Sequence, residues 1–234
     1  MRANPSKSIC NTILGLTLAA AAGVHALPVV GTASGTFVNP LGDPGMVVTG
    51  VGTSNFSWGI GAPPSSLQFV GGPFSTATET VFQFGTLNYY NGAINTGTFA
   101  SSVEMDVGLT LSTPLGGQTY NFNLGLNNTP NNTGTLLGDA DYVSLTSSFS
   151  PTTFNAGGVD YTLEFVGFGD ISGGGAVTTI SEFHVYENAS ASAKLLGRIT
   201  ANIPNPAVPE PTSLVLMGMG VLALGVVSRK KLRA

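Results

Sequence analysis

Cysteine, histidine and charged residues are all scarce in this sequence of 234 residues. The one cysteine, Cys10, lies in an apolar stretch near the N-terminus, so the rest of the chain offers no thiol for a disulfide or a thiolate metal site. Only two histidines are present, His25 and His184, which excludes a histidine metal cluster. Charged residues make up 9% of the chain, against roughly 25% in typical soluble domains.

The few basic residues gather at the two ends of the sequence. Between residues 27 and 208 only Lys194 and Arg198 are basic, whereas the same stretch holds eleven carboxylates. An acidic body repels the phosphates of nucleic acids and of anionic lipids. We therefore exclude nucleic acid as a partner.

Long apolar runs and helical periodicity are absent between residues 28 and 208. Period-two alternation takes their place and is clearest over 101–112, where apolar side chains from Val103 to Leu111 alternate with polar ones. Shorter strand candidates, separated by turn residues, are 55–60, 66–70, 81–84, 120–126, 143–147, 161–165, 180–186 and 195–201. The pattern predicts an all-β ectodomain over 27–201, an antiparallel β-sandwich that is jelly-roll-like.

Residues 1–26 have the organisation of a secretory signal peptide. Arg2 and Lys7 give a positive start, an apolar stretch follows over 9–24, and Val24-His25-Ala26 puts small residues where signal peptidase reads. We expect cleavage after Ala26. The alternative is a signal anchor that stays attached.

The C-terminus carries three elements in order over 209–234. Pro209-Glu210-Pro211 comes first, an uncharged apolar stretch follows over 214–227, and the basic residues Arg229, Lys230, Lys231 and Arg233 end the chain. The stretch is apolar on every face, which favours a transmembrane helix over about 212–228 rather than a buried amphipathic helix, with its basic end in the cytoplasm. At 1.5 Å per residue the stretch is only about 21 Å long, shorter than the roughly 30 Å hydrocarbon core.

This order of elements resembles the PEP-CTERM sorting signal of Gram-negative bacteria. In such proteins an exosortase, a membrane cysteine transpeptidase, recognises the tail and cuts near Pro-Glu-Pro. The resemblance implies signal peptidase and exosortase as partners during export, and a membrane-anchored stage before display at the envelope surface or release. The implied sorting residues are Pro209, Glu210, Pro211, Arg229, Lys230 and Lys231. A Pro- and Asn-rich linker over 202–208 joins this tail to the domain.

Several segments of the body resemble a second family, the choice-of-anchor K domain. They are VGTSNFSWG (51–59), SSLQFVGGPF (65–74), FGTLNYYNGAI (84–94), NNTPNN (127–132), DADYVSL (139–145), YTLEFVGF (161–168) and LLGRIT (195–200). The resemblance spans roughly 31–200 and implies a β-rich bacterial surface domain that occurs with interchangeable anchors. It supplies no catalytic residue.

Candidate catalytic groups are few. His184, beside Glu182, is the only histidine outside the signal peptide that could serve as the base of a nucleophilic triad, and no Gly-x-Ser-x-Gly motif accompanies it; we interpret it as a half-exposed strand residue. Glu104 and Asp106 project from one strand face, as a glycosidase pair would, but charges on an exposed sheet face also serve solvation and edge protection. We expect a protein that is not an enzyme.

Asp139 and Asp141 form the candidate metal site. They follow the Asn-rich segment 127–132, and together these residues provide the oxygen ligands that Ca²⁺ prefers. The full EF-hand loop is missing. The alternative is a turn and a strand edge that bind nothing, and no other cofactor is expected.

Aromatic residues form the candidate glycan contact. Tyr89 and Tyr90 lie at a strand end, so at least one ring is expected to be exposed and able to stack on a sugar. Trp58 shares a face with Phe56, which favours burial in the core. The leading hypothesis is a structural or interaction protein associated with extracellular polysaccharide. The alternatives are a calcium-supported carbohydrate-binding module or adhesin and, third, a secreted hydrolase.

Overall fold

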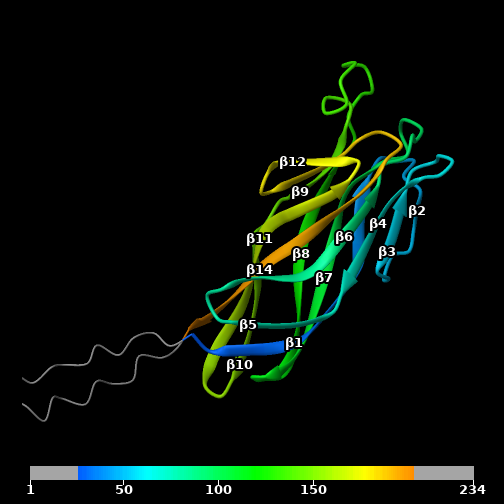
Figure 1. The fold of residues 1–234 in the computed structure, drawn as a ribbon. Coiled ribbons are helices and arrows are strands. Elements are labelled where there is room, and N and C mark those ends of the chain that lie inside the picture. Colours follow the sequence, from blue (N-terminus) through cyan, green and yellow to red (C-terminus); the bar gives the residue numbers. More distant parts are fainter. Residues whose placement is uncertain (1–25, 203–234) are drawn as a thin grey trace, which may run out of the picture.

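The computed structural model describes residues 26–202. These residues form fourteen strands in two curled, antiparallel, seven-stranded sheets (Figure 1). The predicted all-β class is therefore confirmed, and the jelly-roll-like connectivity stays a prediction. The predicted signal peptide, the linker beyond residue 202 and the transmembrane helix lie outside the described residues. Within residues 26–202, no helix has the length and apolar character needed to cross a membrane.

Sheet A has the strand order β12-β13-β9-β8-β7-β1-β5. Its members are β1 (Pro28–Gly42), β5 (Pro73–Ala77), β7 (Ala100–Thr113), β8 (Leu115–Asn127), β9 (Asp141–Leu145), β12 (Gly175–Thr179) and β13 (Glu182–Val185). Sheet B has the order β10-β11-β14-β6-β4-β3-β2. Its members are β2 (Val48–Thr49), β3 (Asn55–Trp58), β4 (Ser65–Gly71), β6 (Val81–Tyr90), β10 (Phe149–Ala156), β11 (Val159–Gly173) and β14 (Ser190–Asn202).

The alternation of β7 places its apolar side chains in the core. Val103, Met105 and Val107 are fully buried, while Glu104 and Asp106 between them face outward. Successive side chains of a strand point to opposite faces, so one face packs on sheet B and the other meets solvent. The strand predicted over 101–112 is confirmed.

The sequence pattern does not predict β1, β2, β5, β10 or β12. In β1 the inward positions include Gly31, Ala33 and Gly35, so the apolar signal of a strand is weak. A Cβ atom on Gly35 would lie 2.7 Å from the Phe69 ring of β4. Glycine at this position therefore lets a large ring of sheet B pack against the β1 backbone.

Several aromatic pairs join the two sheets, and one of them involves Phe165. Phe165 of β11 is fully buried, and its ring centroid lies 5.4 Å from that of Phe122 in the opposite sheet. Phe84 of β6 lies 5.3 Å from Phe165 on the other side. Both pairs are edge-to-face, the geometry that aromatic quadrupoles favour. Phe165 thus packs on aromatic rings of both sheets.

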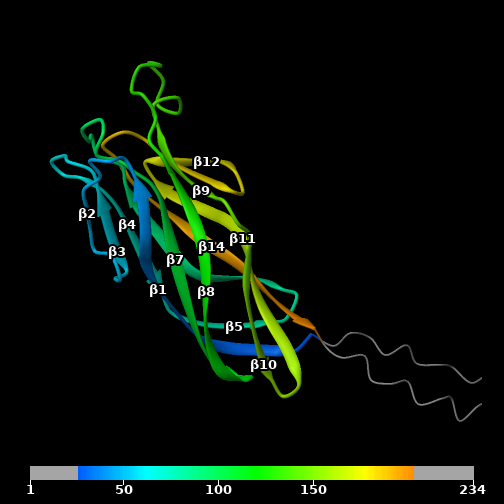
Figure 2. The same ribbon diagram turned by 180° about the vertical axis from the view of Figure 1, so that it is seen from behind.

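The described chain begins and ends at the same end of the molecule, which we call the terminal end (Figure 2). Leu27 exchanges backbone and side-chain hydrogen bonds with Thr78, and Glu79 bonds to Ile199 and Ala201 of β14. The loop over 128–140 projects from the opposite end, the loop end. An attachment at the terminal end therefore leaves the loop end pointing away from the point of attachment.

Replacing Phe165 by alanine is expected to lower the free energy of unfolding by about 3–5 kcal/mol, because it removes a buried ring from both aromatic pairs. Leu136→Ala is the control, since Leu136 is 72% exposed, and is expected to change the stability by less than about 0.5 kcal/mol. Urea denaturation measures both. Equal stability of the two variants would show that Phe165 does not clamp the sheets.

Candidate functional site

The outer face of sheet B carries two rows of uncharged polar side chains, which we call the polar grid. Strand register aligns each row across β3, β4, β6 and β14. The first row is Ser57, Ser66, Tyr90 and Ser190, and the second is Asn55, Gln68, Asn88 and Ser192. Their sequence neighbours on the inner face, such as Phe56 and Leu67, are buried. The outward-facing residues of these four strands therefore form the grid, while their inward-facing residues pack in the core.

Hydrogen bonds order the second row. Asn88 Nδ2 donates to Gln68 Oε1 at 2.9 Å, and Ser192 Oγ donates to Asn88 Oδ1 at 2.7 Å. In the first row the half-buried Tyr90 stands between Ser66 and Ser190, which are small. The result is a set of fixed donors and acceptors with one aromatic ring beside them.

A groove of about 560 Å³ lies over the polar grid, a size within the roughly 300–1,000 Å³ range of ligand sites. None of the described residues that line it is charged. The body is otherwise acidic, so the groove is a part of the surface whose lining residues carry no charge.

Tyr89 is a correction to the predicted glycan contact. Its ring is 2% exposed and packs in the core, 5.7 Å from Trp58 and 6.2 Å from Phe183 between ring centroids. The prediction of a sugar-stacking ring is therefore wrong for Tyr89, because neighbouring residues of a strand face opposite sides. Tyr90 faces the groove, so its glycan contact stays a prediction. Trp58 is buried, as expected.

Asp139 and Asp141, the predicted calcium pair, are held by different partners. Asp139 Oδ1 accepts from Thr133 N at 2.7 Å and from Thr133 Oγ1 at 2.8 Å. These hydrogen bonds hold the pKa of Asp139 below its ordinary value. Asp141 instead starts β9, and its Oδ1 accepts from Thr129 N at 2.6 Å. The spacing of Asp139 and Asp141 in the sequence therefore does not predict that their carboxylates accept hydrogen bonds from different residues.

Asp141 belongs to a buried polar cluster at the loop end. It is 5% exposed, and burial is the main cause that raises its pKa to about 6, with Glu187 adding to the rise against the lowering effect of the Thr129 bonds. Asn91 is fully buried, and its Nδ2 donates to Val185 O at 3.0 Å and to Glu187 Oε2 at 3.2 Å. Burial raises the pKa of Tyr89, and the charges of Asp141 and Glu187 raise it further. These four side chains lie close together.

Glu104 and Asp106 share one outer face of sheet A, as predicted. Asn121 Nδ2 donates to both carboxylates, at 2.7 Å to Glu104 and 2.9 Å to Asp106, and Asn39 Nδ2 donates to Glu104 at 2.8 Å. Burial, followed by the charge of Glu104, raises the pKa of Asp106. Amide donors from β1 and β8 thus hold this pair as part of a surface ladder.

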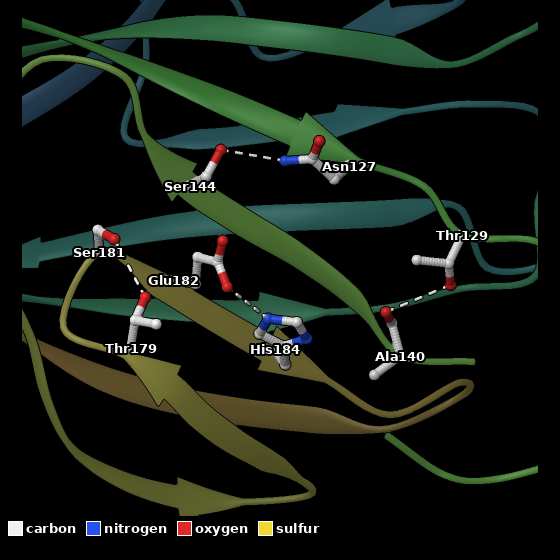
Figure 3. A network of polar contacts seen from close by, with 8 residues as sticks. All are labelled: Asn127, Thr129, Ala140, Ser144, Thr179, Ser181, Glu182 and His184. Carbon is white, nitrogen blue, oxygen red and sulfur yellow. Dashed lines mark hydrogen bonds and ion pairs between the residues drawn. The ribbon is translucent and has the colours of Figure 1, made fainter. Parts of the chain in front are cut away.

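His184 lies half-buried on the outer face of β13 (Figure 3). Its Nε2 is 3.3 Å from Glu182 Oε2, and its ring stacks on Tyr142 with centroids 4.4 Å apart. Figure 3 also shows Asn127 donating to Ser144 Oγ. His184 is a strand residue, as predicted, but its side chain is only 12% exposed, less than the half-exposed position that the sequence suggests.

The sequence pattern predicts neither the polar grid nor the buried contact of Asn91 with Glu187. The grid residues alternate with apolar ones in four segments, which is a usable signal, but their alignment needs the strand register. Asn91 and Glu187 are far apart in the sequence and are joined only by the fold. Among the described residues, no group of three or more His, Cys, Asp or Glu side chains is placed to hold a metal ion.

Comparison with known families identifies one segment. Residues 207–231 match the PEP-CTERM protein-sorting motif. This motif implies an exported protein that an exosortase processes and sorts to the cell surface. No curated protein matches the chain. The match covers the tail alone, so the choice-of-anchor K resemblance of the body stays a prediction.

The raised pKa of Asp141 predicts a pH-dependent stability. Its ordinary value is 3.8, so between about pH 4 and pH 6 the folded protein keeps a proton that the unfolded chain releases. In chelator-containing buffer, the free energy of unfolding is therefore expected to fall as pH rises through this window, by at most about 3 kcal/mol from this group.

Urea denaturation at several pH values measures this slope, and Asp141→Asn should reduce it. Asp160→Asn, at an exposed position of β11, is the control and should leave the slope as it is. Identical slopes in the wild type and in Asp141→Asn would contradict the assignment.

Proposed function

We propose that this protein is an exported, exosortase-processed surface protein whose β domain binds neutral extracellular polysaccharide and catalyses no reaction. The PEP-CTERM match over 207–231 supports the export route. The observation that supports the polysaccharide role is the uncharged polar grid with Tyr90 beside it.

The position of the tail supports an outward-facing grid. The motif begins at residue 207 and the described domain ends at Asn202, so the segment between them reaches at most about 18 Å. While the tail is in the membrane, the terminal end must stay near it. Ser190 and Ser192 lie at the start of β14, a strand of 13 residues that ends at Asn202, so the grid lies about 35 Å from the terminal end along this strand.

The chemistry of the grid suits a neutral, hydroxyl-rich ligand. Ser, Asn and Gln side chains both donate and accept, as sugar hydroxyls do. The ring of Tyr90 provides an apolar surface with a polar tip, and its neighbours Ser66 and Ser190 are too small to cover it fully. An ionic ligand would find no charged partner among the described residues that line the groove.

Two finer assignments belong to the same proposal. The domain is a jelly-roll-like β-sandwich of the choice-of-anchor K type, and after processing it acts as an interaction or structural component of the envelope or exopolysaccharide. A carbohydrate-binding module or adhesin is the closest alternative, and the polar grid supports it equally. A hydrolase has less support, because Glu104 and Asp106 are held by Asn39 and Asn121 on an open sheet face.

Tyr90→Ala is expected to weaken binding to a neutral polysaccharide by about three- to tenfold, the loss of one stacking contact. Affinity electrophoresis in gels containing dextran, hydroxyethyl cellulose or anionic alginate measures the retardation. Tyr142→Ala, a half-buried tyrosine on the opposite sheet, is the control and should bind like the wild type. Retardation by alginate alone, or equal loss in both variants, would overturn the polysaccharide proposal.

Replacing Pro209, Glu210 and Pro211 together by alanine is expected to block processing, so the uncut precursor accumulates in the membrane fraction of the producing cells. Pro206→Ala, just outside the matched segment, should be processed normally. Immunoblots of membrane and extracellular fractions compare the two. Normal processing of the triple variant would contradict the exosortase route.

A further inference from the structure

The buried polar cluster at the loop end contains more negative charge than the protein neutralises. Asp141 lies opposite Val185 in the pairing of β9 with β13, Val185 O accepts from Asn91 Nδ2 at 3.0 Å, and Asn91 Nδ2 also donates to Glu187 Oε2 at 3.2 Å. The fold thus brings together two carboxylates, that of the buried Asp141 and that of the half-buried Glu187. The described residues include only two Lys or Arg side chains, and both are engaged elsewhere: Lys194 pairs with Asp170 and Arg198 pairs with Glu164. Burying uncompensated charge is costly, so the cluster needs a positive partner or a proton.

The same cluster contains acceptor atoms that no described donor reaches. Asn91 Oδ1 and Glu187 Oε1 are both buried and have no hydrogen-bond partner. Asn91 Nδ2 already serves Val185 O and Glu187 Oε2, and the Tyr89 hydroxyl, the other donor of the cluster, bonds to neither of these two acceptors. Buried acceptors without partners are rare in folded proteins and need an explanation.

We propose that Asp141, Glu187 and Asn91 form a site for a divalent cation, Ca²⁺. Two carboxylates and an amide oxygen are hard oxygen ligands of the kind that Ca²⁺ takes, and its flexible coordination accepts further backbone or water oxygens. The cation neutralises both carboxylates and satisfies the two acceptors that lack donors. Asp139 is not a ligand, because Thr133 holds its carboxylate in the loop.

The site connects both sheets. Asn91 directly follows β6 of sheet B, whereas Asp141 starts β9 and Glu187 follows β13 in sheet A. Thr129, which donates to Asp141, also bonds across to Ala140 and so links the loop over 128–140 to the cluster (Figure 3). A bound cation therefore stabilises the contact between the two sheets and the loop over 128–140 at the loop end. It also steadies Tyr90, which lies between the cluster residues Tyr89 and Asn91 in the chain. The site does not depend on the polysaccharide proposal.

A proton shared by Asp141 and Glu187 is the competing explanation. It would relieve the repulsion of the two carboxylates and supply one donor. The two explanations differ in one observable. A cation site gives a stability that rises with Ca²⁺ at neutral pH, whereas a shared proton gives a stability that rises only on acidification.

The test is thermal unfolding of the full-length protein, purified in detergent, stripped with EDTA and titrated with Ca²⁺ or Mg²⁺ at pH 7.5. We expect Ca²⁺ to raise the melting temperature in a saturable way, by about 5–10 °C at a hundredfold excess over its Kd. Mg²⁺, which requires a stricter octahedral geometry, should need a concentration at least tenfold higher for the same shift.

Asp141→Asn and Glu187→Gln keep the side-chain shapes and should abolish the calcium shift. Without metal their melting temperatures should equal or exceed that of the stripped wild type, because one repelling charge is gone. Asp139→Asn is the matched control and should keep the full shift. The proposal is overturned by a wild type that does not respond to 10 mM Ca²⁺, or by a shift that Asp139→Asn loses and Asp141→Asn keeps.

Discussion

The packing of two curled sheets against one shared aromatic core is the constraint on which the rest of this molecule depends. Phe165 and Phe122 meet between the sheets, and every strand that contributes to this core must give its inward positions to apolar or small residues. The outward positions are then free for polar chemistry. On sheet B they form the polar grid, and on sheet A they form the ladder of Glu104, Asp106 and Asn121. At the loop end polar residues occupy inward positions instead, and these residues form the buried polar cluster.

The sequence predicts the parts of this arrangement that depend on local alternation. It predicts β7 well because its inward residues are large and apolar, and it misses β1 because glycine and alanine occupy several inward positions. Adjacent residues such as Tyr89 and Tyr90 receive opposite environments from strand parity, which decides which ring is buried only after the register is known. The contact of Asn91 with Glu187 joins residues 96 positions apart, and no local pattern contains that information.

The charged residues are distributed unevenly between the two ends of the chain and the β domain. The predicted signal peptide and the PEP-CTERM tail contain most of the basic residues, and the domain retains only Lys194 and Arg198, each paired with a carboxylate. An uncharged groove in an acidic domain favours the proposed neutral ligand, and the buried Asp141 beside Glu187, without a basic partner, favours the proposed divalent cation. Both features fit the proposed role of an exported protein that binds polysaccharide. The tail match places the chain on the route to that location.

Mass spectrometry of the surface-exposed or released protein, from the cells that produce it, tests the central claim of export and exosortase processing most directly. We expect an N-terminal peptide that begins at Leu27 and a C-terminal peptide that ends near Pro209-Glu210-Pro211, with no peptide from the basic end at 229–234. A surface-exposed protein that still ends at Ala234 would contradict it.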